Sequence, residues 1–467
     1  MWISDCGFRN PHSAIRNGLR AKPALRGGGV ERTVRLGLIG FGTIGTGVLK
    51  LLQRNRAQIR TRLGASLRVV RIADIDLERD RGVRVERALL TANAQELIDD
   101  PQIDVVIELM GGYTHARRFV LRAIKNGKSV VTANKALLAV HGPEIFASAE
   151  SAGVDIGFEA SVGGGIPIIR TLREGLAGDH NRAIYGIVNG TSNYILSMMT
   201  QQGGEFAAVL GEAQRQGLAE ADPTFDVDGI DAAHKLTLLI QLAFGTAVRF
   251  ADIAIEGIRH VSQLDIGFAR EFGYVIKLLA IAKQDGKQIE ARVHPTMVPR
   301  QHLLAEVNGA NNAIAVQGEA LGSSMYFGLG AGMMPTATAV VADLMEVARN
   351  LVHGGKGRLA PLGYPLAQQR HLAIRPIDEL TSEYYLRFMV VDRPGVLAKI
   401  SGILGAHQIS IASVIQKERE HGASVPIVIR THHARERDLR KALRAIDKLP
   451  AVRAKTAVIR IEDSLGQ

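Results

Sequence analysis

The sequence is poor in the features that build disulfide frameworks and membrane spans. It has one cysteine, Cys6, in 467 residues, so no disulfide can form within the chain and a reducing cytoplasm fits the composition. It has no run of eighteen uninterrupted apolar residues, and therefore no predicted transmembrane helix. With 46% apolar residues, we expect a globular chain of roughly two to four domains.

Most of the chain also lacks an excess of positive charge, although the net charge is +11. Residues 1–35 contribute +5, from seven Lys/Arg and two Asp/Glu, and residues 382–467 contribute +6, from fifteen and nine. Residues 36–381 hold thirty-five of each and are neutral. This distribution argues against nucleic-acid binding, because a polyanion partner needs a basic surface on the body of the protein.

Residues 1–32 are polar and arginine-rich and contain a triple glycine near their end. They lack the apolar core of a secretory signal. The composition favours a disordered arm or an over-long start, and the shortage of acids leaves a transit peptide as the alternative.

A glycine-rich turn follows the first apolar run. In TVRLGLIGFGTIGTGVLKLL (residues 33–52), Val34 to Ile39 predicts a strand, and the pattern becomes helical after the turn. Gly40, Gly42 and Gly45 form G-x-G-x-x-G between the two, which is the context that a dinucleotide-binding turn requires. The helix N-terminus would offer free N–H groups to phosphates.

The second predicted strand, SLRVVRIADID (residues 66–76), gives conflicting signals about the cofactor. Asp74 or Asp76 would hydrogen-bond an adenosine ribose and favour NAD. Arg79 and Arg81 would instead accept a 2′-phosphate and favour NADP. The residues leave both cofactors open.

Apolar runs continue to alternate with helical patterns up to residue 135, which predicts an α/β fold with a doubly wound parallel sheet. Ligands of such sheets bind beyond the carboxyl ends of the strands. The sequence places there Gly111, Gly112, Thr114, Asn134 and Lys135. Because Lys135 follows the polar stretch TAN, we favour a ligand contact over a plain surface lysine.

Two loops allow more than one interpretation. In EASVGGGIP (residues 159–167), bare backbone oxygens beside Glu159 could hold a hard cation, and a flexible turn before a helix is equally consistent. NGTSN (residues 189–193) could form a hairpin turn or a polar lip over a small ligand.

An acidic stretch, LAEADPTFDVDGIDAAHKL (residues 218–236), ends near Lys235 and contains Glu220, Asp222, Asp226, Asp228 and Asp231. A helix from Gly229 onward would place Asp228, Asp231 and Lys235 on one face. A packed or surface role is more common than catalysis for a residue like His234. Without spaced histidines the acids do not suit zinc, and they leave a hard cation open. Beside a nicotinamide, a lysine among carboxylates could donate the proton that an alkoxide requires.

Six motifs, in this order, resemble homoserine dehydrogenases with a C-terminal ACT domain. They are GFGTIG (40–45), TANK (132–135), EASVGGG (159–165), NGTSN (189–193), ADPTFDVDGIDAAHK (221–235) and GLGAG with PTA (328–332 and 335–337). The resemblance covers residues 33–467, with departures at Phe41, Ile44 and Ser192. It implies a Rossmann-type domain over 33–158 completed by a returning helix over 333–352, an inserted α+β catalytic and dimerisation domain over 159–332, a linker over 353–381 and an ACT domain over 382–467.

The resemblance also implies a reaction and its residues. The family reduces L-aspartate 4-semialdehyde reversibly to L-homoserine with NADP or NAD, in threonine, methionine and isoleucine biosynthesis. Lys235 would be the acid/base lysine, with Asp231 and Lys135 beside it, and the substrate would contact Glu220, Asp226, Thr191 and Lys135. The cofactor would contact Gly40, Phe41, Gly42, Thr43, Ile44, Gly45, Ala73, Thr114, Lys135 and Gly332. A sodium ion would be held by Glu159 and the backbone oxygens of Val162, Gly164 and Ile166.

The C-terminal 86 residues, 382–467, read as β-α-β-β-α-β, a ferredoxin-like order. The turn DRPG (392–395) resembles the ligand turn of ACT domains, which makes Asp392 and Gly395 candidate regulatory residues for L-threonine bound between paired copies. A purely oligomerising module is the alternative. We expect a cytoplasmic dimer or tetramer without nucleic-acid or membrane partners. Competing hypotheses are a non-catalytic nucleotide and amino-acid sensor, and an oxidoreductase for another small amino-acid aldehyde or imine.

Overall fold

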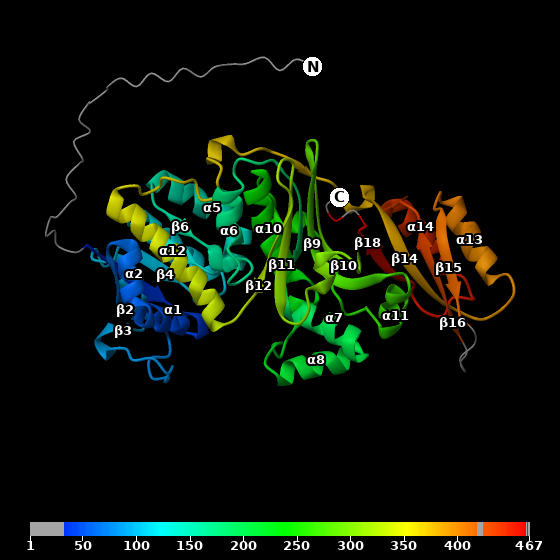
Figure 1. Cartoon of the computed structure of the whole chain (residues 1–467), viewed down its shortest axis with the longest axis horizontal. Helices are drawn as coiled ribbons and strands as arrows, with labels where there is room; N and C mark the ends of the chain where they lie inside the picture. Colours follow the sequence, from blue (N-terminus) through cyan, green and yellow to red (C-terminus); the bar gives the residue numbers. More distant parts are fainter. Residues whose placement is uncertain (1–31, 418–423, 464, 466–467) are drawn as a thin grey trace, which may run out of the picture.

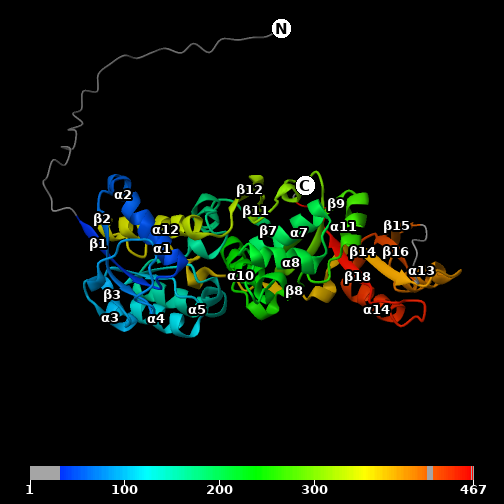
Figure 2. The same ribbon diagram turned by 90° about the horizontal axis from the view of Figure 1, so that it is seen from below.

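The computed structural model describes residues 32–417, 424–463 and 465. The predicted N-terminal arm, including Cys6, lies almost wholly outside the described residues. Three parts follow one another along the long axis of the molecule (Figures 1 and 2). The N-terminal part contains a parallel sheet, the middle part a mixed sheet covered by helices, and the C-terminal part a smaller α/β layer.

The N-terminal sheet has the strand order β3-β2-β1-β4-β5-β6, and all its pairs are parallel. Its strands are β1 (Thr33–Ile39), β2 (Ser66–Ala73), β3 (Leu90–Thr91), β4 (Val105–Glu108), β5 (Ser129–Thr132) and β6 (Ile156–Gly157). Its helices are α1 (Thr43–Arg54), α2 (Arg56–Leu63), α3 (Ala94–Asp99), α4 (Thr114–Lys125) and α5 (Lys135–Ala152). The order confirms the predicted doubly wound sheet, in which strand order reverses next to β1.

A helix from far along the chain completes this part. Helix α12 (Met333–His353) packs against α1, β5 and β6. Gly47 allows the close contact, because a Cβ there would lie 2.8 Å from Met333 O. The middle of the chain is therefore inserted between β6 and α12.

The middle part is built on the strand order β12-β11-β7-β9-β10. The strands are β7 (Asn181–Ile187), β8 (Ala254–Ile255), β9 (Tyr274–Asp285), β10 (Gln288–Pro299), β11 (Asn311–Gly318) and β12 (Gly322–Leu329). The helices are α6 (Ile168–Arg170), α7 (Gly190–Gln202), α8 (Phe206–Arg215), α9 (Thr224–Val227), α10 (Ile230–Phe244) and α11 (Gln263–Glu271).

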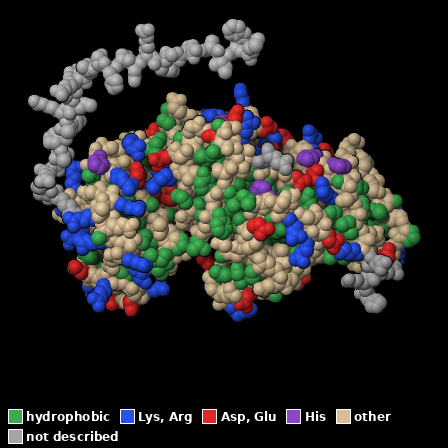
Figure 3. All heavy atoms as spheres, in the orientation of Figure 1, with side chains coloured by type: hydrophobic (Ala, Val, Ile, Leu, Met, Phe, Trp, Pro, Cys, Tyr) green, Lys and Arg blue, Asp and Glu red, His purple; other side chains and the backbone are tan. Residues whose placement is uncertain are grey.

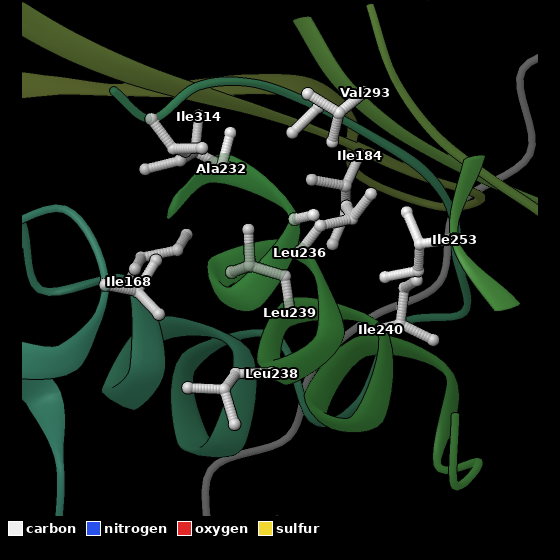
Figure 4. Packing of buried hydrophobic residues seen from close by; sticks show 14 of the residues in the cluster. Ile168, Ile184, Ala232, Leu236, Leu238, Leu239, Ile240, Ile253, Val293 and Ile314 are labelled. Atoms are coloured by element: carbon white, nitrogen blue, oxygen red, sulfur yellow. The ribbon is translucent and has the colours of Figure 1, made fainter. Parts of the chain in front are cut away.

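Helix α10 is the central element of this part. All of its residues from Asp231 to Phe244 are buried, as expected of a helix that is apolar on most faces. Leu236 and Ile240 point toward side chains of the sheet and of the loops around it (Figure 4). Each fully buried leucine or isoleucine contributes about 1.5–3 kcal/mol through removal of apolar surface from water. This packing fixes the polar residues that α10 carries near its N-terminus.

The C-terminal part has the strand order β18-β14-β16-β15 with two helices. Its elements are β14 (Thr381–Val390), α13 (Val396–Ala406), β15 (Ile411–Gln416), β16 (Val425–Thr431), β17 (Ala434–Arg435), α14 (Glu436–Ile446) and β18 (Ala457–Ile461). The order confirms the ferredoxin-like prediction. Strand β18 also pairs in parallel with β10 through Thr296↔Arg460 and Met297↔Ile461, so one sheet runs from the middle part into the C-terminal part.

The predicted linker, residues 353–381, packs along the middle part of the molecule. Within it, β13 (Ala373–Ile374) pairs with β10, and Thr246 forms an isolated bridge with Arg370. Tyr364 also packs against Gly245, where a Cβ would lie 2.9 Å from the tyrosine ring. The resemblance predicted a linker over residues 353–381, and the structure adds these long-range contacts.

Candidate active site

The β1–α1 turn forms an open cradle at the carboxyl end of the parallel sheet. Gly40 has a φ of +93°, and a Cβ there would lie 2.6 Å from the backbone of Leu109. A Cβ on Gly45 would lie 2.3 Å from Gly40 O, so glycine lets α1 begin this close to the turn. A Cβ on Gly42 would meet nothing within 4 Å. The space above Gly42 is open, and the N-terminal N–H groups of α1 face it without a side-chain cap.

The end of β2 lies beside this cradle. Asp74 Oδ2 accepts a hydrogen bond from Phe41 N at 2.5 Å, and Arg81 Nη2 lies 3.3 Å from Asp74 Oδ1. The Arg81 guanidinium also lies 4.6 Å from the centre of the Phe41 ring. Gly40 N donates to Ala73 O at 2.9 Å. Asp74, which favoured NAD, and Arg81, which favoured NADP, are therefore paired with each other.

Exposed apolar side chains surround the carboxyl ends of the strands. Ile75 follows β2, Met110 and Tyr113 follow β4, and Met334 lies in the first turn of α12. Ile75 is 98% exposed. Apolar surface of this kind around a polar turn suits the flat rings of a ligand.

A buried carboxylate organises the ends of β4 and β5. Glu108 accepts hydrogen bonds from Thr132 Oγ1 at 2.7 Å and from Met110 N at 3.0 Å, and burial raises its pKa. Asn134 then donates to Gly112 O at 2.5 Å and caps α5 by accepting from Leu137 N. We did not predict a role for Glu108. The sequence feature that could have indicated it is a single acidic residue within the apolar run VVIELM (residues 105–110).

Asp231, near the start of α10, joins two lysines that come from different parts of the molecule. Its Oδ2 lies 2.6 Å from Lys235 Nζ, and its Oδ1 lies 2.8 Å from Lys135 Nζ. Lys235 Nζ also donates to Val188 O at 2.6 Å. Asp231 and Lys235 are nearly inaccessible, whereas the side chain of Lys135, the first residue of α5, is 35% exposed. The structure thus brings all three predicted catalytic residues together where the sheet meets the inserted part.

The electrostatics of this triad are coupled. Burial would raise the pKa of Asp231, but Lys235 and Lys135 outweigh it and hold that pKa well below its usual range. Burial lowers the pKa of Lys235, Asp231 opposes this shift and Lys135 adds to it, and the net change is downward. For Lys135 the attraction of Asp231 outweighs burial and raises the pKa. Of the two lysines, Lys235 is therefore the one that gives up its proton more readily.

Asn189 connects the triad to a second carboxylate. Its Nδ2 donates to Asp231 Oδ2 at 2.8 Å and to Asp226 Oδ1 at 2.7 Å, while its Oδ1 caps α7 by accepting from Ser192 N. The hairpin interpretation of residues 189–193 is wrong, because the segment begins a helix. Asn189 itself was not among the predicted site residues, although an asparagine before Gly-Thr-Ser is a recognisable N-cap.

Two other residues predicted to bind substrate, Glu220 and Thr191, lie at the outer edge of this site. The side chain of Glu220 is exposed, and its charge acts on Lys135. Thr191 Oγ1 donates to Leu218 O at 2.9 Å and ties α7 to the acidic loop. Asp228 does not share the helical face of Lys235: it precedes the helix and forms an ion pair with Arg259 Nε at 2.5 Å.

His234 packs rather than joining the triad. Its ring stacks on Phe250 with centroids 4.3 Å apart and lies 5.3 Å from the Phe225 ring. Burial lowers its pKa, so the ring is neutral at pH 7.

The glycine loop after Glu159 is tightly packed. The Glu159 carboxylate accepts hydrogen bonds from Ile169 N at 2.8 Å and Arg170 N at 2.9 Å. Burial, together with the nearby carboxylate of Asp343, raises its pKa to about 7. Gly164 has a φ of +58°, and a Cβ there would lie 2.5 Å from the backbone of Gly330. Close backbone packing therefore requires glycine at position 164.

Within the described ranges no group of three or more His, Cys, Asp or Glu side chains is placed to hold a metal ion. In the same ranges, no helix has the length and apolar character needed to cross a bilayer.

Comparison with known proteins adds independent information. The family model for the NAD binding domain of homoserine dehydrogenase matches residues 40–159, the homoserine dehydrogenase model matches residues 167–345, and the ACT domain model matches residues 384–451. The homoserine dehydrogenase of Neisseria gonorrhoeae is 45% identical over 431 residues, which cover 92% of this chain and 99% of that protein. The chain belongs to the homoserine dehydrogenase family.

Solved structures of homoserine dehydrogenases agree with this assignment. The crystal structure of the enzyme from Thiobacillus denitrificans has 47% sequence identity and a TM-score of 0.88, over 93% of this chain and 99% of that one. A hyperthermophilic archaeal homoserine dehydrogenase in complex with NADPH has 25% identity and a TM-score of 0.58, over 71% of this chain and 99% of that one. The chain is thus an oxidoreductase with a nicotinamide-binding domain and a C-terminal ACT domain.

The ACT turn predicted to be regulatory lies between β14 and α13. Gly395 has a φ of +84° and is the N-cap of α13, and residues 392–395 are exposed. The structure therefore shows an exposed turn that leads directly into α13.

Proposed function

We propose that this homoserine dehydrogenase reduces L-aspartate 4-semialdehyde reversibly to L-homoserine, with the proton moved by Lys235. The observation that carries this assignment is the buried contact of Asp231 with Lys235 and Lys135. It lies where the cofactor end of the parallel sheet meets the inserted part.

The chemistry requires one acid and one base at the same oxygen. The nicotinamide, when bound, supplies or accepts the hydride at the substrate carbon. Lys235 donates a proton to the oxygen as the aldehyde is reduced, and it removes that proton in the reverse direction. Val188 O and Asp231 hold its ammonium in place, and Lys135 favours the negative charge that develops on the oxygen.

Acidic groups at the rim suit the substrate's ammonium. Glu220 is exposed above the triad, and Asp226 is half-buried and held by Asn189. We assign the ammonium to these carboxylates and the hydrogen-bonding lip to Thr191. Substrate binding then neutralises carboxylates that would otherwise repel one another.

The residues of the cradle fit a nicotinamide dinucleotide. Its pyrophosphate would lie at Gly42, Thr43 and Ile44, its adenosine beside Ala73, and its nicotinamide side near Thr114, Lys135 and Gly332. The open space at Gly42 supports this placement. NADP and NAD both remain candidates, because Asp74 and Arg81 neutralise each other.

A monovalent cation fits the loop after Glu159. Burial and the neighbouring carboxylate of Asp343 raise the pKa of Glu159 to about 7, and a cation beside Glu159 would favour its charged form. Among the described residues no hydrogen bond falls on the backbone oxygens of Val162 and Gly164, whereas Ile166 O accepts from Ile168 N at 2.8 Å. We propose sodium on Glu159 and the oxygens of Val162, Gly164 and Ile166, where it would neutralise Glu159 and stiffen the loop under α12.

Self-association is supported by an apolar edge. Strand β12 is at the end of the mixed sheet, and Leu321, Phe327 and Leu329 there are each more than half exposed. Hydrophobic side chains also gather over the middle of the molecule on the face seen in Figure 3. We propose a dimer or tetramer in which a second copy covers β12.

For the ACT domain we propose feedback control by L-threonine at Asp392 and Gly395, between paired copies. The role would be in threonine, methionine and isoleucine biosynthesis in the cytoplasm. The exposed turn and the single cysteine of the chain support these assignments.

The test is an absorbance assay of cofactor reduction with L-homoserine, run with NADP⁺ and NAD⁺ in turn and with L-threonine added. We expect turnover with at least one cofactor and inhibition by L-threonine that Asp392→Asn weakens. Absence of turnover with both cofactors would contradict the proposed reaction. Inhibition that is unchanged in Asp392→Asn would contradict the turn as the threonine site.

A further inference from the structure

Asn189 is a buried amide whose orientation is fixed by the backbone of the next helix. It lies between β7 and α7 and is 5% exposed. As the N-cap of α7, its Oδ1 accepts a hydrogen bond from Ser192 N at 2.8 Å. A backbone N–H can only donate, so the amide oxygen must face Ser192 and the amide nitrogen must point away from it. Helix α7 therefore decides which way this side chain points, independently of the charges around it.

The amide nitrogen of Asn189 lies between two carboxylates that come from different helices. Its Nδ2 donates to Asp231 Oδ2 of α10 at 2.8 Å and to Asp226 Oδ1 of α9 at 2.7 Å. An amide nitrogen has two hydrogens, so these two bonds use both. Two carboxylates beside one nitrogen repel each other, and the shared donor offsets part of this repulsion. A neutral side chain does so without adding a third cation to the two lysines of the triad.

The carboxylate of Asp231 is oriented by three donors. Its Oδ2 accepts from Lys235 Nζ at 2.6 Å as well as from Asn189, and its Oδ1 lies 2.8 Å from Lys135 Nζ. Of these three donors, the asparagine is the uncharged one, and a helix cap holds it in place. Val188, the preceding residue, accepts from Lys235 Nζ at 2.6 Å. Two consecutive residues after β7 thus locate the Lys235 ammonium, one directly and one through Asp231.

The position of the Asp226 carboxylate depends on the same end of α7. Helix α9 has four residues, too few for a helix to be stable on its own, and it packs against α7 and α10. Ser192 Oγ donates to Asp226 O at 2.9 Å, and Asn189 holds the side chain of the same residue. Without Asn189 the backbone of Asp226 would stay attached to α7, and its carboxylate would lose this anchor.

We propose that Asn189 is a positioning residue of the reaction. Its amide orients Asp231 for proton transfer by Lys235, and it orients Asp226 for the substrate ammonium. This inference rests on the proposed function, which assigns those two roles. One side chain then fixes the distance between the proton-donating nitrogen and a carboxylate that binds the ammonium. The aldehyde and the ammonium of the substrate are separated by a chain of fixed length, so this geometry brings the aldehyde oxygen to the lysine.

The titratable groups that face Lys235 come from α5, α9 and α10. They are Lys135, Asp226, Asp231 and the neutral His234. Asn189 shares Asp231 Oδ2 with Lys235, so loss of its N–H groups strengthens the remaining ion pair and raises the pKa of Lys235. Asp226 also raises that pKa, so its neutralisation acts in the opposite direction. In the proposed mechanism neutral Lys235 is the base in homoserine oxidation, so a raised pKa moves the increase of kcat/KM to higher pH.

The experiment compares the same exchange at two helix N-caps in steady-state oxidation of L-homoserine. Asn189→Ser keeps an acceptor for the cap of α7 and loses both donated hydrogen bonds. We expect kcat/KM to fall about tenfold or more, the KM for L-homoserine to rise and the KM for the cofactor to stay unchanged. The pH profile of kcat/KM should move upward by about half a pH unit or more.

Asn93→Ser is the matched control. Asn93 is exposed and caps α3 in the N-terminal part, where it accepts from Gln95 N at 3.0 Å. This variant should keep the KM and the pH profile of the unchanged protein. If Asn189→Ser behaved like Asn93→Ser in both respects, the positioning role would be wrong, whatever the stability of the two variants.

A double-mutant cycle tests whether Asn189 acts through Asp226. Asp226→Asn should raise the KM for L-homoserine and move the pH profile downward, opposite to Asn189→Ser. Because both changes act on the ammonium through one carboxylate, the double variant should have about the KM of Asp226→Asn alone. Effects on KM that multiply, or a normal KM in Asp226→Asn, would overturn this part of the role.

A crystal structure of Asn189→Ser gives a readout that does not depend on activity. The carboxylates of Asp231 and Asp226 should turn away from their positions in the unchanged protein. Carboxylates that keep their positions would overturn the positioning role, whatever reaction the enzyme performs. Absence of turnover in the unchanged protein, or normal turnover in Lys235→Met, would instead concern the proposed function.

Discussion

The molecule contains two charge clusters that differ in their basic side chains: one contains lysines and the other an arginine. At the active site Asp231 holds two lysines, and at the ACT junction Glu256 and Glu436 hold Arg460. Burial lowers the pKa of Lys235, whereas the carboxylates around Arg460 outweigh burial and raise its pKa. A lysine can therefore exchange a proton, and the arginine stays charged and bridges two carboxylates with a fixed geometry. We infer from the comparison that one cluster is suited to proton transfer and that the other holds the middle and C-terminal parts together.

The strongest test of this contrast removes the lysine. We expect Lys235→Met to lower kcat by about 10²–10⁴-fold, because general acid–base catalysis is lost, with little change in cofactor affinity. Steady-state kinetics and cofactor titration check both.

Lys277→Met is the matched control for that variant. Lys277 is also a buried lysine of the middle part, whose pKa burial lowers to about 8, and it donates to Val307 O at 2.6 Å. It lies outside the triad and should keep its turnover. Equal losses in the two variants would contradict the assigned role of Lys235.

Removing the arginine should affect stability instead. We expect Arg460→Met to lower the free energy of unfolding by about 3–5 kcal/mol, because Glu436 would remain buried without its main partner. Chemical denaturation measures the loss, and kcat per folded molecule should stay near normal. Arg453→Met, at an exposed position nearby, should change little. If Arg460→Met kept full stability but lost its activity, the structural role assigned to Arg460 would be wrong.

The pH dependence of kcat/KM tests whether Lys135 changes the pKa of Lys235. Lys135 lowers the pKa of Lys235, so Lys135→Met should raise it. In the proposed mechanism neutral Lys235 is the base in homoserine oxidation, so kcat/KM should rise as the pH passes the lysine pKa. The profile of the residual activity should therefore move to higher pH, whereas Lys125→Met, at an exposed position, should leave it in place. A profile identical to that of the unchanged protein would show that the lysines are not coupled.

The smallest expected effect concerns the proposed cation. Sodium at about ten times its Kd should stabilise the protein by about 1.4 kcal/mol, and Glu159→Gln should remove this increment. Thermal unfolding in sodium chloride and in tetramethylammonium chloride at equal ionic strength measures it. If the variant kept the full sodium response, Glu159 would not be a ligand.

Local patterns predicted the fold and much of the candidate site. Glycine spacing and strand–helix alternation predicted the parallel sheet, and Asp231 with Lys235 was visible as an i, i+4 pair on a helix. Asn189 was missed because its two carboxylate partners lie 37 and 42 residues away. The hairpin error at residues 189–193 has a related cause: the same polar residues favour turns and helix N-caps, and tertiary contacts decide between them.

The partners of strand β10 affect when the sheet can form during synthesis. The outer edge of β10 is covered in sections by β8, β13 and β18, which come from residues 254–255, 373–374 and 457–461. During synthesis, part of this edge stays without a partner until β18, at residues 457–461, has been made. Unpaired strand edges template aggregation. The C-terminal part thus also covers an edge of the enzyme's sheet, and we expect a chain truncated before β13 to aggregate.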